Sequence, residues 1–282
     1  CSRAGIERVG FSGGEPFLAL DFIAELAKAA VERGLYFDRL MTNGDWWRDE
    51  AELRAALGLV YDAGFDGILG LSFDSYHGQS PERLSAFLKA YFELWGRKDG
   101  AEILSVRSSD DTAFLGDLDS LARALGGAVE RRDDGEPFRI ADDAYLSRSE
   151  EDADDGSGLS LPILRSTRSA SAQEAAWDSS HWFKDDYCEG PGNIFYVHPD
   201  ASVAVCCGFA NERPELVVGR MGDGCDALLA AASSSAYVRT CYEKGLGAYR
   251  AELESAGVGF PGKTADMCFF CDWLCEKGLS RP

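Results

Sequence analysis

Residues 6–16 of this chain read IERVGFSGGEP, an apolar stretch followed by two glycines, a glutamate and a proline. The apolar residues predict a buried strand over residues 6–11, with a tight turn at the glycines. Glycines let a backbone approach a ligand closely, Glu15 offers a carboxylate to an ammonium group, and Pro16 stiffens the turn. An ordinary turn in which Glu15 caps the following helix explains the same residues equally well.

Strand-like and helix-like segments alternate from this stretch to about residue 132. Glycine ends the helices predicted over 19–33 and 49–63, and Pro81 begins another over 81–95. This alternation predicts an α/β fold with a parallel sheet and crossover helices, whose ligands bind at the carboxyl ends of the strands. The remaining predicted segments are strands within 36–44, 65–75 and 101–109 and a helix over 117–125.

The alternation stops after residue 132, and the rest of the chain has a different character. Residues 133–187 are rich in Asp, Glu, Ser and Ala, which predicts an exposed connection. Residues 188–282 carry eight of the nine cysteines and predict a small α+β domain. Its predicted elements are a hairpin of strands 193–198 and 202–206, helices near 224–237 and 239–256, and a cysteine-rich end.

Composition narrows the classes of function. A chain of 282 residues that is 45% hydrophobic can form one large domain and a smaller one. Its net charge of −20 argues against nucleic-acid binding, because phosphates need a basic face, and it indicates a solvated acidic surface. The sequence has no membrane-spanning apolar run and no signal peptide, so we expect a cytoplasmic protein without a membrane partner.

The cysteines form two informative pairs. Cys188 and Cys206 are separated by 17 residues, and Cys268 and Cys271 form a CxxC that Cys275 follows. Four converging thiolates hold either a zinc ion or an iron–sulfur cluster, and spacing does not separate the two. The remaining cysteines are further candidate ligands or buried inert thiols: Cys207, Cys225 and Cys241.

Polar residues end the later predicted strands as well. Thr42-Asn43-Gly44 ends one, Ser72-Phe73-Asp74-Ser75 the next, and Arg107 and Ser108 the one after. A turn at Asn43, a helix cap at Asp74 and a surface arginine explain these residues one at a time. Three polar motifs at successive strand ends are harder to explain in that way. His77 is a candidate acid or base, or else a hydrogen-bonded loop histidine.

Together, FSGGEP, TNG and SFDS resemble the motifs of the radical S-adenosylmethionine (radical SAM) superfamily. The resemblance implies a partial (β/α)6 barrel over residues 1–132. In that superfamily the glycines and glutamate of GGEP hold the amino group of the cofactor's methionine part, and the later strand ends lie near its ribose or the substrate. The cofactor-binding residues implied here are Gly13, Gly14, Glu15, Pro16, Thr42, Asn43, Ser72, Asp74 and Arg107.

Residues 188–282 resemble the SPASM and twitch modules that follow the barrel in many of these enzymes. Their leading cysteine pair encloses a glycine where this chain has Ala201. A full SPASM module has seven cysteines and a longer gap in its second group than the three residues between Cys271 and Cys275. The resemblance therefore favours one auxiliary [4Fe–4S] cluster. The metal ligands it implies are Cys188, Cys206, Cys268, Cys271 and, as a further ligand, Cys275.

The resemblance implies an enzyme that generates a 5′-deoxyadenosyl radical and abstracts hydrogen from a peptide or protein side chain, or from a small molecule. It also implies a reducing partner such as a flavodoxin or ferredoxin. The superfamily's CxxxCxxC loop, which holds the cofactor-cleaving cluster, is absent from these 282 residues. Because the chain opens on Cys1 rather than methionine, we expect an N-terminally truncated, inactive fragment; a degenerate paralogue is the alternative.

Two interpretations from other functional classes remain open. A non-catalytic scaffold protein would use the four cysteines for a structural zinc ion. An electron-transfer protein would use a lone cluster, but it leaves GGEP, TNG and SFDS unexplained.

Overall fold

The structure is a computed structural model of the 282-residue chain. It describes residues 4–74, 77–105, 112–133, 135, 137–148, 158–165, 176–184, 187–188, 190 and 193–280. The chain forms two compact units, Cys1–Thr167 and Arg168–Pro282.

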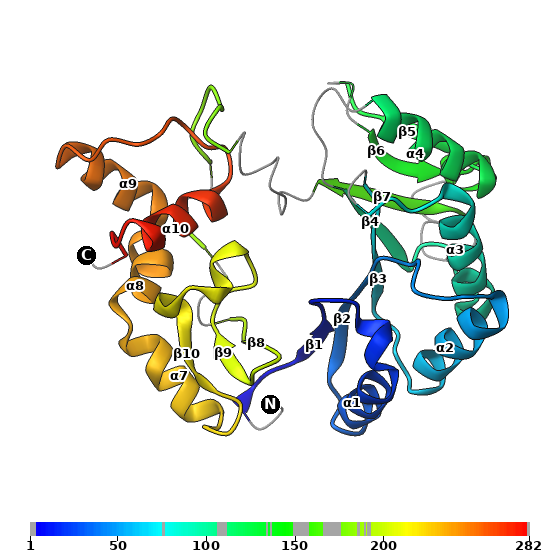
Figure 1. The fold of residues 1–282 in the computed structure, drawn as a ribbon, viewed down its shortest axis with the longest axis horizontal. Helices are drawn as coiled ribbons and strands as arrows, with labels where there is room; N and C mark the ends of the chain where they lie inside the picture. The colour runs from blue at the N-terminus through cyan, green and yellow to red at the C-terminus, as the bar shows by residue number, and fades with distance from the viewer. Residues whose placement is uncertain are drawn as a thin grey trace. The chain divides into compact units, whose positions relative to one another are not determined.

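The first unit is built on a seven-stranded mixed sheet, with strand order β1-β2-β3-β4-β7-β6-β5 (Figure 1). Its parallel strands are β1 (Arg8–Phe11), β2 (Tyr36–Thr42), β3 (Ile68–Ser72), β4 (Ala101–Ser105) and β7 (Ser160–Arg165). Two antiparallel strands, β6 (Pro137–Ala141) and β5 (Ala128–Arg131), complete the edge beyond β7. The predicted α/β fold with a largely parallel sheet is therefore confirmed for this unit.

Four helices connect the strands, and all of them lie on one face of the sheet in Figure 1. They are α1 (Leu20–Glu32), α2 (Glu50–Asp62), α3 (Pro81–Trp95) and α4 (Thr112–Ala124), with a short 3₁₀ helix, η2 (Pro16–Ala19), before α1. Their apolar stripes pack against sheet residues such as Leu40, Leu71 and Ile103, all of them buried. This core holds the carboxyl ends of β1, β2 and β3 in fixed positions, which matters for the site below.

The stretch after residue 132 differs from the expected exposed connection. It contributes β6, β7 and a short helix, α5 (Asp143–Leu146), to the first unit. The apolar run LPIL lies inside β7, where Leu161 is fully buried between β4 and β6. The surrounding Asp and Ser residues hide these short strands from composition-based reasoning, because two strands of five or six residues add few apolar positions.

The second unit has a three-stranded antiparallel sheet in the order β10-β9-β8 (Figure 1). The predicted hairpin is confirmed as β8 (Tyr196–Val197) and β9 (Ser202–Ala204), and β10 (Val217–Arg220) is a third strand that the sequence did not reveal. The helical segments are η4 (Phe209–Glu212), η5 (Pro214–Leu216), α7 (Cys225–Ser234), α8 (Ala236–Arg239), the π-helix η6 (Thr240–Lys244), α9 (Leu246–Ser255) and α10 (Met267–Glu276).

The last helix, α10, carries both aromatic residues and cysteines. Phe270 and Trp273 pack with Trp182 and Phe260 in the core of this unit. The cysteines of α10 are spaced three and four residues apart, and two of them, Cys271 and Cys275, belong to the same buried core as the aromatic residues. Among the described residues, no helix is long and apolar enough to cross a membrane.

Candidate functional site

Glu15 lies at the end of β1 and is held by donors from two segments. Its Oε1 accepts a hydrogen bond from the Thr42 hydroxyl at 2.9 Å and from the Phe17 amide at 3.1 Å, and its Oε2 accepts from the Asn43 amide at 2.7 Å. The bond from Phe17 makes Glu15 the N-cap of η2, so the capping role considered for it is present. All three donors are neutral, so the carboxylate is oriented while its charge is left for a cationic partner.

Gln79 joins the end of β2 to the end of β3. Its Nε2 donates to the carbonyl of Ser72 at 2.6 Å and also to the carbonyl of Asn43. Gln79 is 6% exposed, and its Oε1 is a buried acceptor to which none of the described groups donates. Sequence reasoning missed this residue, although it follows SFDS closely and a buried amide is a common way to tie loops together.

Asp74 and His77 form a pair directly after β3. His77 Nδ1 lies 2.8 Å from Asp74 Oδ1, and the His77 amide donates to the same oxygen at 3.2 Å. The Asp74 side chain is 2% exposed, whereas that of His77 is 41% exposed. The hydrogen bond with Asp74 raises the pKa of His77, and the charges of Asp74 and Glu15 act in the same direction. Asp74 does not cap α3, since Ser80 does.

These side chains form what we call the strand-end cluster: Glu15, Thr42, Asn43, Asp74, His77 and Gln79. It unites polar groups from the ends of β1, β2 and β3, as the sequence predicted for the first motifs. Gly13 and Gly14 precede it with φ angles of 85° and 53°, a backbone that favours glycine. Open space surrounds Gly14. An oriented carboxylate, an exposed glycine turn and an orphaned acceptor fit a ligand with an ammonium group.

Other predicted residues contribute less or lie elsewhere. Pro16 is buried as the first residue of η2, and Ser72 offers its carbonyl to Gln79. Arg107 and Ser108 lie outside the described residues, as does Ser75.

In the second unit, several thiols gather around Gly208. A Cβ atom at this position would lie 3.0 Å from Cys268 Sγ and 3.7 Å from Cys206 Sγ, so glycine leaves the space between the two sulfurs open. Burial raises the pKa of the Cys268 thiol, and Asp266, Cys206, Cys188 and Cys207 raise it further.

The local fold explains how these thiols meet. Cys206 follows β9, and its Sγ accepts a hydrogen bond from the Gly208 amide at 3.2 Å. Arg213, a few residues on, forms a two-point ion pair with Asp272 of α10 at 2.6 and 2.9 Å. This pair fastens the Cys206 loop to the helix that carries Cys268.

Cys271 and Cys275 belong to a second thiol group with Cys241. Cys271 Sγ lies 3.0 Å from the Tyr237 hydroxyl, and all three cysteines are buried. A hydrogen bond with Cys241 raises the pKa of Cys271, and a hydrogen bond with Cys271 together with burial raises that of Cys275. The structure thus places Cys268 and Cys271 in different thiol groups.

Across the described residues, no three Cys, His, Asp or Glu side chains stand in an arrangement ready to hold a metal ion. The predicted ligand set therefore stays a prediction. Its donor chemistry fits a thiophilic metal best around Gly208, where the sulfurs of Cys206 and Cys268 lie and where Cys188 acts electrostatically on Cys268.

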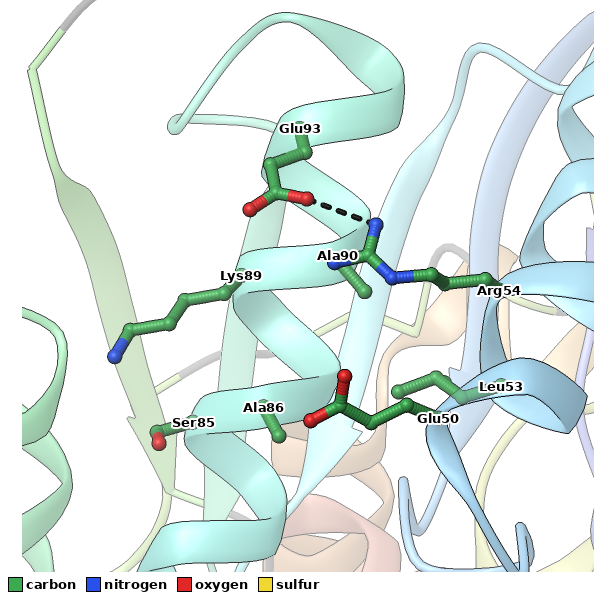
Figure 2. A pocket seen from close by; sticks show the side chains of 8 residues that line it. All are labelled: Glu50, Leu53, Arg54, Ser85, Ala86, Lys89, Ala90 and Glu93. Atoms are coloured by element: carbon green, nitrogen blue, oxygen red, sulfur yellow. Dashed lines mark ion pairs between the residues drawn. The ribbon is translucent and has the colours of Figure 1, made fainter.

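A recess of about 240 Å³ between α2 and α3 is a weaker candidate (Figure 2). Its charged residues are Glu50, Arg54, Lys89 and Glu93, and Arg54 pairs with Glu93 at 2.8 Å. None of the predicted site residues lines it, and its surface is a pair of neighbouring helices with ordinary solvated charges. We assign no function to it.

The sequence matches no protein-family model, and no curated protein matches it either. Among solved structures, native anSMEcpe with bound AdoMet is similar with a TM-score of 0.43 and 16% identity, covering 84% of this chain and 68% of that chain. Native anSMEcpe with bound AdoMet and Cp18Cys peptide gives a TM-score of 0.45 and 15% identity, covering 84% and 69%. Because both TM-scores lie below 0.5, they do not establish a common fold.

Proposed function

We propose that this chain belongs to a radical SAM enzyme, that its first unit is part of a (β/α)6 barrel, and that the strand-end cluster binds S-adenosylmethionine. The observation that carries the proposal is the orientation of Glu15 by Thr42 and Asn43, which unites the GGEP and TNG motifs in one hydrogen-bonded group. The winding of the first unit also supports it, because β1 to β4 are in sequence order with every connecting helix on one face, as in a barrel.

Within this proposal the chain's own residues bind and orient. The Glu15 carboxylate accepts the ammonium group of the ligand, while Thr42 and Asn43 fix the direction of its two oxygens. Gly13 and Gly14 give the ligand access to the backbone at this edge. When bound, S-adenosylmethionine is the source of the 5′-deoxyadenosyl radical that removes a hydrogen atom from the substrate, which we propose is a peptide or protein side chain.

We also propose that the second unit holds one auxiliary [4Fe–4S] cluster, and that a flavodoxin or ferredoxin is the reducing partner of the enzyme. Cys206 and Cys268 are the best supported ligands, because both of their sulfurs lie beside Gly208, and Cys188, whose sulfur lies beside Gly190, acts electrostatically on Cys268 and is the proposed third. Cys271 is the proposed fourth ligand and Cys275 a further one, although both now contact other partners. The cluster would supply an electron acceptor or an anchor for the substrate.

A second function is favoured by the same thiols: a non-catalytic scaffold protein with a structural zinc ion. It predicts one zinc, no iron and no affinity for S-adenosylmethionine. Iron, sulfide and zinc analysis of the anaerobically reconstituted protein separates the two, with about four irons and four sulfides expected for the cluster.

Titration calorimetry with S-adenosylmethionine tests the strand-end cluster directly. We expect the wild-type protein to bind, and Glu15→Gln to weaken binding at least tenfold, because the amide keeps an oxygen acceptor for Thr42 but loses the charge. Glu25→Gln, on an exposed position of α1, is the matched control and should bind like the wild type. Absence of binding by the wild type, or equal binding by Glu15→Gln, would contradict the proposal.

A further inference from the structure

The strand-end cluster contains an acidic side chain, Glu15, and a basic side chain, His77. Glu15 follows β1 and His77 follows β3, so both lie at the same edge of the sheet, on either side of the end of β2. We propose that His77 binds the carboxylate of the α-amino-acid moiety whose ammonium group binds Glu15. This inference rests on the proposed function, because it names the second charged contact to the same part of S-adenosylmethionine.

Hydrogen bonds link the strand ends from which the two groups come, although none of the described bonds joins Gln79 to His77 itself. Asn43 donates its amide to Glu15 and receives Gln79 at its carbonyl. Gln79 also reaches the Ser72 carbonyl, and it lies two residues beyond His77 in the same turn. The network spans three strand ends, so Glu15 and His77 keep a defined relation that a compact zwitterion can match.

The His77 ring is held in a position from which it can bind an anion. Its Nδ1 and its backbone amide both bond to the buried Asp74, so the ring is held at two points. None of the described hydrogen bonds involves Nε2, and 41% of the side chain is exposed. The hydrogen bond with Asp74 raises the pKa of His77, which favours the protonated ring, and in that form Nε2 carries a proton that it can donate to a carboxylate.

The charges of the cluster also match this ligand. Two carboxylates, Glu15 and Asp74, and one imidazolium leave the cluster with a single net negative charge. Asp45 and Arg83, two charged groups on the segments that frame it, pair with each other and cancel. S-adenosylmethionine carries a sulfonium, an ammonium and a carboxylate, hence one net positive charge.

Decarboxylated S-adenosylmethionine isolates the proposed contact, since it keeps the ammonium and the sulfonium and lacks only the carboxylate. By titration calorimetry near neutral pH, we expect His77→Gln to weaken S-adenosylmethionine binding about tenfold and to change binding of the decarboxylated analogue less than twofold. His181→Gln, at an exposed position in the second unit, is the matched control and should change neither.

The pH dependence gives a readout that a purely structural role would not move. Wild-type affinity for S-adenosylmethionine should fall as pH rises through the raised pKa of His77, and affinity for the analogue should not fall in that range. Asp74→Asn should shift the fall to lower pH. Proton NMR can follow the ring itself, because the chain has three histidines, and ligand binding should raise the pKa of His77 further.

The outcomes separate this inference from the proposed function. If the wild type binds neither compound, both fail. If both compounds bind through Glu15 but His77→Gln weakens them equally or not at all, only the role of His77 fails. Should His77→Gln unfold, His77→Lys replaces it: that variant should keep the preference for S-adenosylmethionine over the analogue without the fall in affinity near the histidine pKa, and loss of the preference would overturn the inference.

Discussion

The strand-end cluster and the thiols around Gly208 are both groups of polar atoms, but they are stabilised in different ways. Every contact that orients Glu15 comes from the backbone or from a neutral side chain of the same unit, so its geometry is complete without a ligand. The thiols around Gly208 do not stabilise one another as thiolates, because burial and neighbouring acidic groups raise the pKa of Cys268. The first is organised by strand ends, whereas the second, as far as the described residues show, has no three side chains arranged to hold a metal ion.

This difference has a thermodynamic consequence. Thiols with raised pKa values stay protonated until a metal displaces their protons, so metal binding and proton release are coupled. The free energy of that binding then adds to the stability of the folded state. We therefore expect metal binding to raise the stability of the second unit strongly. Ligand binding should raise the stability of the first unit far less.

The largest expected effect is loss of the metal from the second unit. Cys268→Ala should abolish iron binding and remove the metal-dependent part of the free energy of unfolding, several kcal/mol in magnitude on the scale of about 10 kcal/mol known for structural metal sites. Elemental analysis and thermal unfolding with and without reconstitution measure both quantities.

Cys225→Ala is the matched control, because Cys225 begins α7, an element separate from the Cys206 loop and from α10, which carries Cys268. It should keep the metal. Cys271→Ala and Cys207→Ala then test the fourth ligand: we expect the first to lose the metal and the second to retain it. The reverse result would assign the fourth position to Cys207, which the structure already places near Cys268.

A smaller effect is expected when the strand-end cluster loses an internal donor. Thr42→Val removes the hydroxyl that donates to Glu15 and also accepts the Gly44 amide at 3.0 Å. Thr42 is 2% exposed, so the amide would be left buried without this acceptor, and we expect a loss of about 1–3 kcal/mol in the free energy of unfolding by urea.

The variant Thr42→Val also tests whether the orientation or the charge of the Glu15 carboxylate matters more for ligand binding. Affinity for S-adenosylmethionine should fall only a few-fold, less than for Glu15→Gln, since the carboxylate remains but is less well oriented. Thr112→Val, at the start of α4 and apart from the cluster, serves as a control of the same chemical change. A loss of affinity as large as that of Glu15→Gln would mean that orientation, not charge, dominates.

The sequence predicted the strand-end cluster better than the thiol sites because the two depend on different distances along the chain. GGEP, TNG and SFDS each follow a strand, and parallel strands bring their carboxyl ends to one edge, so register alone unites them. Gln79 was not predicted, because the sequence around it gives no sign that its side-chain amide bridges two strand ends.

The thiol sites depend on loops and on the phase of one helix. Cys268 and Cys271 are neighbours in a CxxC, yet one faces Gly208 and the other faces Tyr237. Spacing does not predict that division, because it follows from how Arg213 and Asp272 fasten α10 to the Cys206 loop. The strand β7 was missed for a related reason: one of its partners, β4, lies far away in sequence.

The smallest effect is the pH dependence that the Asp74–His77 pair adds to stability. Because the folded-state pKa of His77 is raised, the pair contributes fully below the unfolded pKa of about 6.5, and its contribution is lost as pH rises through the folded value. The His77 side chain is 41% exposed, so solvent screening limits the effect to below about 1 kcal/mol.

Urea unfolding between about pH 5 and 9 measures this term as the difference between wild type and His77→Gln. The difference should shrink as pH rises, and a salt titration should reduce it at low pH, since part of it is a partly exposed charge interaction. A constant difference across this range would mean that His77 stabilises its turn through the backbone bond to Asp74 alone. In that case the first unit's cluster would be organised entirely by neutral donors, and its charges would be left for a ligand to use.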